Sequence, residues 1–416
     1  MGRPIELGAG VVLPRMNSGD SQRWRRLADG CPLPFVGGWV GFLSYEAGQA
    51  FEPICRRHTT FAGVPQAKWW ACDTLLVYDN TGDVWYAAGT DVPGYSEDRP
   101  SPARRVEELA NWAEGAAPGS REEVRSLPTQ AALRSNMTRD EYVAAIGRIH
   151  EHLRAGDIYQ VNFAQRFSAP FAGHPYELYE RLCAANPAMF AACLAWDADA
   201  YGGPRTAVLS SSPELFLDLR GRKVVTRPIK GTRRRTGDAA IDAAARAELE
   251  TSAKDRAELV MIVDLERNDL GRVCEFGSVR VVSAAETEIH PTVFHRVATV
   301  EGVLREDRDA LELIAATFPG GSITGAPKVR AMQIIDALEP DPRGPYCGAI
   351  GTIGIDGSMM LNIAIRTMVV ARGRVSLWAG GGIVIDSDAD AEYAETLDKA
   401  EGMRRALGCD RLETGE

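Results

Sequence analysis

The sequence predicts an α+β fold in which antiparallel sheet packs against long helices. Many of its strand-like segments are separated by turn residues and not by helices long enough to cross over a sheet. Strands joined by turns pair in antiparallel fashion, whereas parallel neighbours need a crossover connection. Capped, periodic helices lie between groups of these strands. Both observations favour α+β over a doubly wound parallel sheet.

The composition changes abruptly at one place in the chain. The segments VPGYSEDRPSPARR, EGAAPGSREEVRS and LPTQAALRSN, within 92–136, are rich in Pro, Gly, Ser and charge. Such a composition is typical of a connector, although a helix is predicted around Val106–Trp112. We therefore predict an N-terminal portion at 1–90, a connector at 91–136 and a C-terminal portion at 137–416.

The C-terminal portion opens with a capped helix and a strand. Thr138 and Glu141 form a capping box, and Gly156 ends the helix. The helix carries one apolar stripe, made of Tyr142, Ile146, Ile149 and Leu153. The strand at 158–167 alternates, with Tyr159, Val161, Phe163 and Phe167 on one face and Gln160, Asn162 and Arg166 on the other. We expect it to be half-buried, with one polar face.

The later elements follow the same logic. Strands are predicted for AVLSSSPELFLDL, KVVTRPI, GSVRVV, YCGAIGTIGI, MMLNIAIRTMVV and RVSLWAGGGIVI. Helices are predicted for LVMIVDLERNDLG, VRAMQIIDAL and DADAEYAETLDKAEGMRRAL.

The composition also limits the classes of function. The chain has 416 residues, of which 45% are hydrophobic, enough for a substantial core. Its net charge of −10 does not suit nucleic acid or an anionic membrane as the main partner. It lacks a run of about 18 apolar residues that would span a membrane, and its N-terminus lacks a signal sequence. Eight cysteines without a CxxC motif argue against a disulfide scaffold or a zinc site, so we expect a cytoplasmic protein.

Two acidic pairs are candidates for a metal site. Asp255 and Glu258 open one predicted helix, and Glu392 and Glu395 lie on another. Residues i and i+3 share a helical face, so these carboxylates could hold a hard cation such as Mg²⁺, which usually takes only one or two of them. A solvated helix face, with Glu395 paired to Lys399, explains the same spacing and is the commoner case.

Two glycine-rich segments and one arginine are candidates for anion binding. FPGGSITGAPK (318–328) runs from one helix into the next, and AGGG (379–382) ends an apolar strand. Their N–H groups could face an anion, although a plain tight turn explains both segments equally well. Arg366 lies within an otherwise apolar strand, where an arginine generally has an anionic partner, either a structural Asp or a substrate carboxylate. With the acidic pairs, these residues suggest a Mg²⁺-dependent enzyme acting on a dicarboxylate.

One lysine raises a separate question. Lys230 lies in VVTRPIKGTRRR (224–235), between a β-forming residue and a turn glycine. Most lysines are solvated, so the segment alone favours a surface charge over a reactive amine.

Six motifs in a fixed order carry a resemblance to a known family. They are SSPELFL, TRPIKGTRRR, RAELVMIVDLERNDLGRV, FPGGSITGAPKVRAMQIIDALEP, GPYCGAIG and AGGGIVIDSDADAEYAETLDKA. The chain thereby resembles the chorismate-utilising enzymes over about residues 137–405, and more weakly at GGWVGFLSYEAG. The resemblance implies a single large α+β unit of two antiparallel sheets packed face to face, with helices outside, as in anthranilate synthase component I. We adopt this arrangement in place of separate domains.

Two positions distinguish branches of this family. Isochorismate and salicylate synthases carry a water-activating lysine where this chain has Gln160, so the resemblance implies ammonia as the nucleophile. Anthranilate synthases read PIAGT where this chain reads PIKGT, with Lys230, as aminodeoxychorismate synthases do. The chain therefore resembles most the component I enzymes that make 4-amino-4-deoxychorismate for para-aminobenzoate and folate biosynthesis.

The resemblance implies a covalent route. If Lys230 attacks C2 of chorismate first, ammonia must arrive at C4 and expel the lysine, whereas direct attack of ammonia at C2 leads to anthranilate. The attacking amine must be neutral. Burial, Mg²⁺ and a nearby Arg366 would lower its pKa, and carboxylates would oppose this.

The resemblance also implies roles for other residues. Glu214 would protonate the departing hydroxyl, and His295 lies near the leaving group or is a satisfied core histidine. The metal positions are Glu258 and Glu395, which bind Mg²⁺, and Asp255 and Glu392, which lie behind them or act through water. The substrate positions are Gln160, Gly231, Thr232, Tyr346, Arg366, Gly380, Gly381, Gly382 and Lys399.

The chain carries no recognisable glutaminase signature. We therefore expect it to use free ammonia or ammonia from a separate glutamine amidotransferase subunit in a heterodimer. Two alternatives stay open, an anthranilate synthase component I and a catalytically silent binding subunit. The family's tryptophan-pocket segment is not clear around Val11–Ser18.

Overall fold

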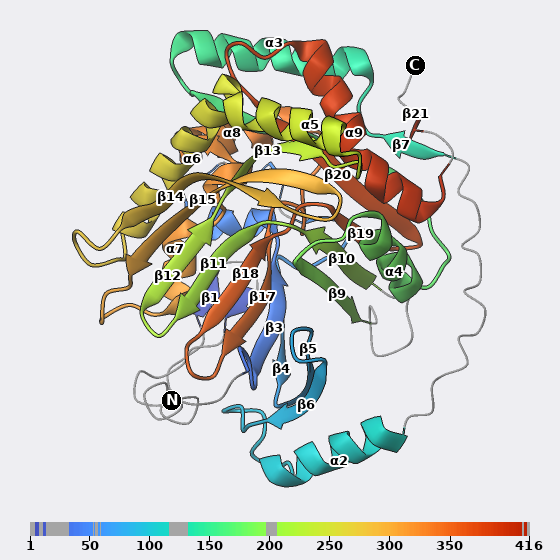
Figure 1. Cartoon of the computed structure of the whole chain (residues 1–416), viewed down its shortest axis with the longest axis vertical. Helices are drawn as coiled ribbons and strands as arrows, with labels where there is room; N and C mark the ends of the chain where they lie inside the picture. Colours follow the sequence, from blue (N-terminus) through green and yellow to red (C-terminus); the bar gives the residue numbers. More distant parts are fainter. Residues whose placement is uncertain are drawn as a thin grey trace.

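The chain folds around two large, mostly antiparallel sheets, as predicted. The computed structural model describes residues 5–7, 11–13, 33–52, 54, 57–58, 60–115, 132–196, 206–409 and 412–413. Within these residues the two sheets share one core, helices lie on the outside, and two small hairpins complete the fold (Figure 1). The predicted α+β class is confirmed.

The first sheet has eight strands in the described part of the chain. Their order is β21 (Leu412–Glu413), β7 (Leu133–Ser135), β8 (Gln160–Pro170), β20 (Arg374–Ile383), β19 (Thr367–Ala371), β10 (Thr206–Ser212) and β9 (Phe190–Trp196), with β16 (Gly325–Ala326) paired to β8. All of these pairs are antiparallel except that of β21 with β7.

The second sheet has nine strands among the described residues. Their order is β13 (Ile229–Arg234), β15 (Val293–Val303), β12 (Lys223–Arg227), β11 (Leu215–Arg220), β18 (Met359–Ile363), β17 (Ala349–Gly354), β3 (Gly38–Leu43) and β4 (Ala67–Cys72), with β14 (Arg280–Ile289) paired to β15. The two small hairpins are β1 (Ile5–Leu7) with β2 (Val11–Leu13) and β5 (Thr74–Asp79) with β6 (Val84–Gly89).

The helices surround the sheets. They are α2 (Pro102–Gly115), α3 (Arg139–Ala155), α4 (Pro175–Ala185), α5 (Ala239–Thr251), α6 (Ala253–Gly271), α7 (Ala310–Thr317), α8 (Lys328–Leu338) and α9 (Ala389–Leu407), with the short 3₁₀ helices η1 (Tyr45–Ala50) and η2 (Gly321–Ile323). Figure 1 shows α3 at one end of the long axis and α2, with the β5–β6 hairpin, at the other.

Two hydrophobic cores lie on opposite faces of the eight-stranded sheet. The larger core lies between the sheets and takes Val208 from β10 and Phe216 from β11. The smaller core takes Leu209 from β10, together with Leu182 of α4 and Met403 of α9. Successive residues of β10 therefore enter different cores, as the period of a strand requires.

The capped helix is confirmed and the strand after it is partly corrected. Thr138 and Glu141 exchange the two capping-box hydrogen bonds, and Gly156 ends α3 with φ of 77°. Of the expected polar face of the strand, Gln160 and Asn162 are buried, at 1% and 8% exposed, whereas Arg166 is half-buried. Tyr159, expected on the apolar face, is 70% exposed. The reason for the burial is tertiary, because β8 lies inside a sheet whose two faces are both covered.

Two segments predicted as single strands are each broken, and their halves belong to different sheets. AVLSSSPELFLDL forms β10 and β11, and MMLNIAIRTMVV forms β18 and β19. We call the connections between these halves, residues 213–214 and 364–366, the sheet crossovers. Because β10 pairs with β19 and β11 pairs with β18, the crossovers run side by side. Arg366 therefore lies in a crossover, and its predicted position within a strand is wrong.

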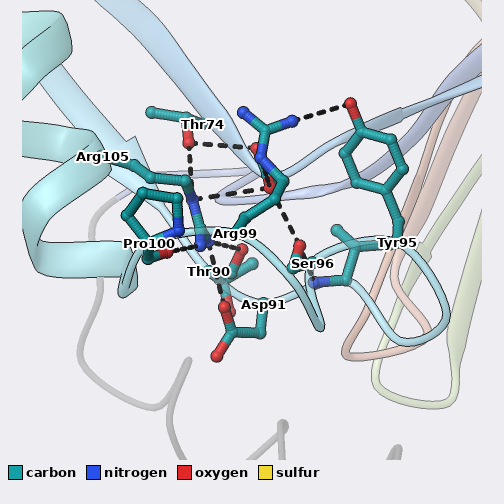
Figure 2. A network of polar contacts seen from close by, with 10 residues as sticks. Thr74, Thr90, Asp91, Tyr95, Ser96, Arg99, Pro100 and Arg105 are labelled. Carbon is teal, nitrogen blue, oxygen red and sulfur yellow. Dashed lines mark hydrogen bonds and ion pairs between the residues drawn. The ribbon is translucent and has the colours of Figure 1, made fainter.

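A buried ion pair joins the connector helix α2 to the β5–β6 hairpin (Figure 2). Arg105 and Asp73 are 5% and 3% exposed, with Nε and Oδ2 3.5 Å apart. Arg105 Nη2 also donates to the carbonyl of Thr90 at 2.9 Å. Asp73 accepts from Ser96 Oγ at 2.9 Å and pairs with Arg99 at 3.1 Å. Each buried charge thus has several partners, as burial requires.

The helix predicted around Val106–Trp112 is confirmed by α2. The division into 1–90, 91–136 and 137–416 stays a prediction, while β3 of the first part pairs with β17 of the last in one sheet. Most of Val11–Ser18 lies outside the described residues. Among the described helices, none is long and apolar enough to cross a membrane.

Candidate active site

The glycine run Gly380–Gly382 lies beside the second sheet crossover. β20 pairs with β8 as far as Ile383, whereas its pairing with β19 ends at Leu377. Beyond Leu377, β20 therefore faces the crossover and not a neighbouring strand on that side. Arg366 has φ of 49°, a left-handed conformation that is uncommon outside glycine. The crossovers thus leave one edge of β20 without a strand partner.

Close contacts explain why this run is glycine. A Cβ atom on Gly382 would lie 1.9 Å from Gln160 Nε2, and one on Gly380 would lie 2.5 Å from the carbonyl oxygen of Phe163. A Cβ atom on Gly381 would lie 3.0 Å from Glu392 Oε2. The predicted substrate residue Gln160 therefore packs directly on this run, and its own Oε1 is buried with no hydrogen-bond partner among the described residues.

Three hydrogen bonds tie the crossovers to the strand ends beside them. The three bonds are Ile363 N to Glu214 O at 3.1 Å, Ser211 N to Arg366 O at 3.1 Å, and Ser212 Oγ to Ile363 O at 2.6 Å. The predicted general acid Glu214 and the predicted anion-binding Arg366 are thereby held on adjacent segments.

Arg366 carries a charge that no residue in the described part of the chain balances. Within the described residues, no hydrogen bond or ion pair involves its guanidinium, and burial lowers the pKa of Arg366. Even so, an arginine stays charged at neutral pH. Of the two partners the sequence allowed, a structural Asp is absent among the described residues. The charge is therefore available to an anionic ligand.

Lys230 and Glu214 are both biased toward their uncharged forms. Lys230 Nζ donates to the carbonyl of Ser322 at 3.2 Å. Burial lowers the pKa of Lys230, and Lys399 adds to this, while Glu258, Glu214 and Glu395 oppose it. Glu214 is 4% exposed.

Burial raises the pKa of Glu214, against the hydrogen bond from Ser322 and the charge of Lys230. One site therefore favours a neutral amine beside a neutral acid. Burial lowers the pKa of Lys230 as expected, and the positive charge that adds to this effect is Lys399, whereas Arg366 lowers the pKa of His295.

His295 is both buried and close to the site. It is 2% exposed, and its Nδ1 lies 2.9 Å from Thr232 Oγ1 on the paired strand. Burial lowers the pKa of His295 to about 3, and Arg366 and His290 add to this. It is therefore a neutral histidine near neutral pH, bonded to one predicted substrate residue and close to another.

The two acids on α9 differ in exposure: Glu392 is buried, whereas the side chain of Glu395 is 47% exposed and lies on a solvated part of the helix. Glu392 is 3% exposed, accepts from Ser387 Oγ at 2.7 Å and lies 3.4 Å from Lys254 Nζ. Glu395 pairs with Lys399 at 2.6 Å, as the alternative explanation expected. Burial acts to raise the pKa of Glu395, but the nearby lysines outweigh it and lower the pKa. Lys399 also donates to the carbonyl of Gly380 at 2.9 Å.

The acidic pair on α6 lies near the other one. Asp255 pairs with Arg233 at 3.1 Å and lies against Gly231, which has φ of 88°. Glu258 has no hydrogen bond or ion pair in the described part of the chain. Burial raises the pKa of Glu258, and Asp255 and Glu392 add to this.

The carboxylate oxygens of these two pairs are suitable ligands for a hard cation. A bound cation would also offset the negative charge of Glu258, which has no ion-pair partner among the described residues. Across the described residues, no cluster of three or more His, Cys, Asp or Glu side chains is arranged to hold a metal. The Mg²⁺ site, which needs only one or two carboxylates, stays a prediction.

Tyr346 is fixed by an aromatic stack that the sequence did not predict. Its ring stacks on Trp378 with centroids 5.9 Å apart and planes 5° apart. Phe61 packs edge-on against Trp378 at 4.8 Å, and the Arg343 guanidinium lies 5.9 Å from the Tyr346 ring. Trp378 lies on β20, two residues before the glycine run. Its place in the strand that carries the AGGG motif is the sequence signal that could have identified this stack.

The segment 318–328 does not offer its central amide to a ligand. Gly321 N donates to Glu266 Oε1 at 3.1 Å. Ser322 contacts Lys230 through its carbonyl and Glu214 through its side chain. The anion-binding interpretation of this loop is therefore wrong at Gly321, and Ser322 is a site residue that the sequence analysis missed. A separate small pocket, lined in part by Tyr45, contains none of the predicted site residues.

Comparisons with known proteins identify similar chains. The family described as chorismate binding enzyme matches residues 15–405. The chain is 43% identical over 375 residues to aminodeoxychorismate synthase component 1 of Klebsiella aerogenes, covering 90% of this chain and 78% of that protein. It is 40% identical over 380 residues to anthranilate synthase component 1 of Streptomyces coelicolor, covering 90% of this chain and 73% of that protein.

Solved structures show the same fold. Anthranilate synthase component I from Streptococcus pneumoniae superposes with a TM-score of 0.79 at 30% identity, over 95% of this chain and 86% of that chain. The menaquinone-specific isochorismate synthase from Escherichia coli has a TM-score of 0.65 at 17% identity, over 95% of this chain and 84% of that one. The two-sheet architecture is thus common to both.

We predict that Gly382→Ala lowers the free energy of unfolding by about 1–3 kcal/mol, the usual size of an overpacking effect. The added Cβ would collide with Gln160, so the loss should shrink in a Gln160→Ala background, as measured by urea unfolding of the four proteins of a double-mutant cycle. Gly147→Ala is the control, because a Cβ there meets nothing within 4 Å. An equal loss in both backgrounds would contradict the contact.

Proposed function

Because the chain belongs to the family of chorismate binding enzymes, we propose that it works as an aminodeoxychorismate synthase component I. It converts chorismate and ammonia to 4-amino-4-deoxychorismate and water. The observation that carries this is Lys230, a lysine whose pKa is lowered by burial, next to Glu214, whose pKa is raised by burial. A neutral amine and a protonated acid are what a nucleophilic lysine and its general acid need.

In the first step the neutral amine of Lys230 attacks C2 of chorismate. The ring electrons shift toward C4 and the C4–O bond breaks. Glu214 gives its proton to the departing hydroxyl, which leaves as water, and becomes a carboxylate. The lysine nitrogen is now a secondary ammonium bonded to C2.

In the second step ammonia attacks C4. The ring electrons shift back and the C2–N bond breaks, so that Lys230 leaves as a neutral amine. The Glu214 carboxylate takes a proton from the new C4 ammonium group. Both residues return to their starting forms, and the balance is chorismate plus ammonia giving product plus water.

The two carboxylates of chorismate have separate binding groups in this proposal. Arg366, whose charge the described residues leave unpaired, binds the enolpyruvyl carboxylate with Tyr346 and the glycine run, and Lys399 lies close by. Gly231 and Thr232 face the ring carboxylate. His295, bonded to Thr232, lies near the leaving group as a neutral side chain.

Mg²⁺ is part of the same proposal. Glu258 and Glu395 would hold it, with Asp255 and Glu392 behind them, and the bound ion would neutralise the ring carboxylate. The unpaired, partly buried Glu258 supports this assignment. Gln160 takes the place of a water-activating lysine, and its unpaired Oε1 could accept a hydrogen bond from ammonia, which supports an aminating reaction.

We expect Lys230→Ala to lower formation of 4-amino-4-deoxychorismate by about three orders of magnitude, since the nucleophile is lost. Without ammonia, the parent protein should accumulate an adduct of chorismate minus water on Lys230, seen by intact-protein and peptide mass spectrometry. Adduct formation should fall as pH falls, because the lowered pKa of Lys230 still leaves the amine protonated in acid. Lys223→Ala, an exposed lysine on β12, is the control.

Product analysis separates the rival activities. Chorismate, Mg²⁺ and ammonium salts should give a 4-amino product that yields para-aminobenzoate only when a lyase is added. Fluorescent anthranilate from the pure chain would instead identify an anthranilate synthase, and no turnover would favour a silent binding subunit.

Replacing the proposed metal ligands should raise the Mg²⁺ requirement. In Glu258→Gln and in Glu395→Gln, the Mg²⁺ concentration for half-maximal activity should rise by at least about 10-fold, since even outer-sphere partners have effects of this size. Asp264→Asn, an exposed acid on α6, is the control. An unchanged Mg²⁺ titration in either Gln variant would remove that residue from the site.

A separate glutamine amidotransferase subunit should supply ammonia from glutamine. The motive is the missing glutaminase signature, and the component 1 naming of the relatives agrees with it. We expect the pure chain to turn over chorismate with ammonium salts and not with glutamine. Glutamine-dependent turnover by this chain alone, measured as glutamate release, would refute the partner.

A further inference from the structure

α6 carries a second acidic pair about three turns beyond the first. Glu266 and Asp269 have the same i, i+3 spacing as Asp255 and Glu258, and they lie on the same face of the helix. They are 2% and 3% exposed. None of the proposed steps uses them.

This second pair fastens the loop between α7 and α8. Glu266 Oε1 accepts the hydrogen bond from Gly321 N in the middle of the loop, at 3.1 Å. Asp269 forms a buried ion pair with Lys328 at the loop's end. Lys328 Nζ also donates to the carbonyl of Thr317 at 2.7 Å, which ties the end of the loop to its beginning.

The residue after Gly321 contacts both reacting groups. The carbonyl of Ser322 accepts from Lys230 Nζ at 3.2 Å, and its side chain lies close enough to Glu214 to lower the pKa of that acid. A shift of Gly321 would therefore move Ser322 and change its contacts with the Lys230 amine and the Glu214 carboxyl group.

We propose that Glu266 is a positioning residue for the reaction, and that its carboxyl group holds the Gly321–Ser322 turn where Ser322 meets Lys230 and Glu214. The inference rests on the proposed function, because it concerns the same two groups. Glu266 itself touches neither chorismate nor the reacting atoms.

Glu266 does this as a neutral carboxylic acid. Its Oε2 is buried without a hydrogen-bond partner in the described part of the chain, a costly environment for an ionised oxygen. Burial raises the pKa of Glu266 to about 8, with Asp269 and Glu214 adding to the rise and Lys328 and the Gly321 N–H opposing it. These are the charged groups that face it, from α6 itself, from α8 and from the first crossover.

Neutrality matters to Glu214. Glu214 must become a carboxylate once it has given up its proton, and a second negative charge beside it would oppose that form. A neutral Glu266 can accept the hydrogen bond from Gly321 without adding this charge.

The first arm of the test measures protonation through stability. The pKa of Glu266 is raised on folding from 4.5 to about 8. Its stability contribution is therefore fully present below pH 4.5 and is lost as the pH rises to about 8. Glu266→Gln keeps the acceptor and cannot ionise, so its Tm relative to the parent should rise between pH 5 and 8.5. A Tm difference that is constant over this range would overturn the neutral acid.

The second arm measures positioning. Glu266→Leu removes the acceptor and should slow adduct formation on Lys230 by about 10- to 100-fold, the size of effect that small misplacements cause. The KM for chorismate should change little, and Glu266→Gln should restore the rate. Glu266→Asp, which shortens the side chain by one methylene, gives the same test if the Leu variant does not fold.

The outcomes separate this inference from the proposed function. Asp264→Asn, two residues earlier on the exposed side of α6, is the matched control for both arms. If Glu266→Leu and Glu266→Asp form the adduct at the parent rate, Glu266 is not a positioning residue. If the parent protein forms no adduct, the covalent route is wrong. The effect of the Glu266 variants is then measured on the rate at which the protein converts chorismate.

Discussion

The site depends on how two neighbouring chain segments pass from one sheet to the other. A buried connection must satisfy its backbone N–H and C=O groups without a strand partner. Here each crossover is bonded to the strand end beside the other one, through Ile363 N to Glu214 O and Ser211 N to Arg366 O, and Ser212 Oγ joins the two strand ends by donating to Ile363 O. The same arrangement ends the pairing of β19 with β20 and leaves an edge of β20 open. An acid, an arginine and a glycine run are brought together as a consequence.

Burial then sets the charge of the groups around this opening. It biases Lys230, Glu214, His295 and Glu266 toward their neutral forms. Arg366 cannot lose its proton at neutral pH and has no acidic partner in the described residues, so it keeps an unbalanced positive charge. A site that favours the neutral forms of its nucleophile and its acid, beside a fixed cation, suits an anionic substrate that must be attacked by an amine.

The two acidic pairs of α6 lie on one face of the helix but have different surroundings. On α6, Asp255 pairs with Arg233 of β13 and Glu258 lies near Glu392 of α9, whereas Glu266 and Asp269 lie under the loop that ends at Lys328. The spacing of the two pairs is the same, and the environment opposite each pair differs. The aromatic stack of Tyr346 on Trp378 shows a similar dependence, since Phe61 from the first part of the chain packs against it.

The sequence by itself determined the α+β class, the capped helix α3, the two acidic helices and the presence of a lysine where relatives of another branch have alanine. These features are local, because a capping box or a helical period acts within a few residues. Only the tertiary structure decided that two apolar segments break at Glu214 and Arg366, that Gln160 is buried, and that Gly321 is bonded to Glu266. Period and propensity are the same on both sides of each break, since both halves are buried strands. Pro213 is a local signal at the first break, because proline cannot donate to a sheet ladder. Which sheet each half joins is set by pairing with strands far away in the chain, which no local pattern records.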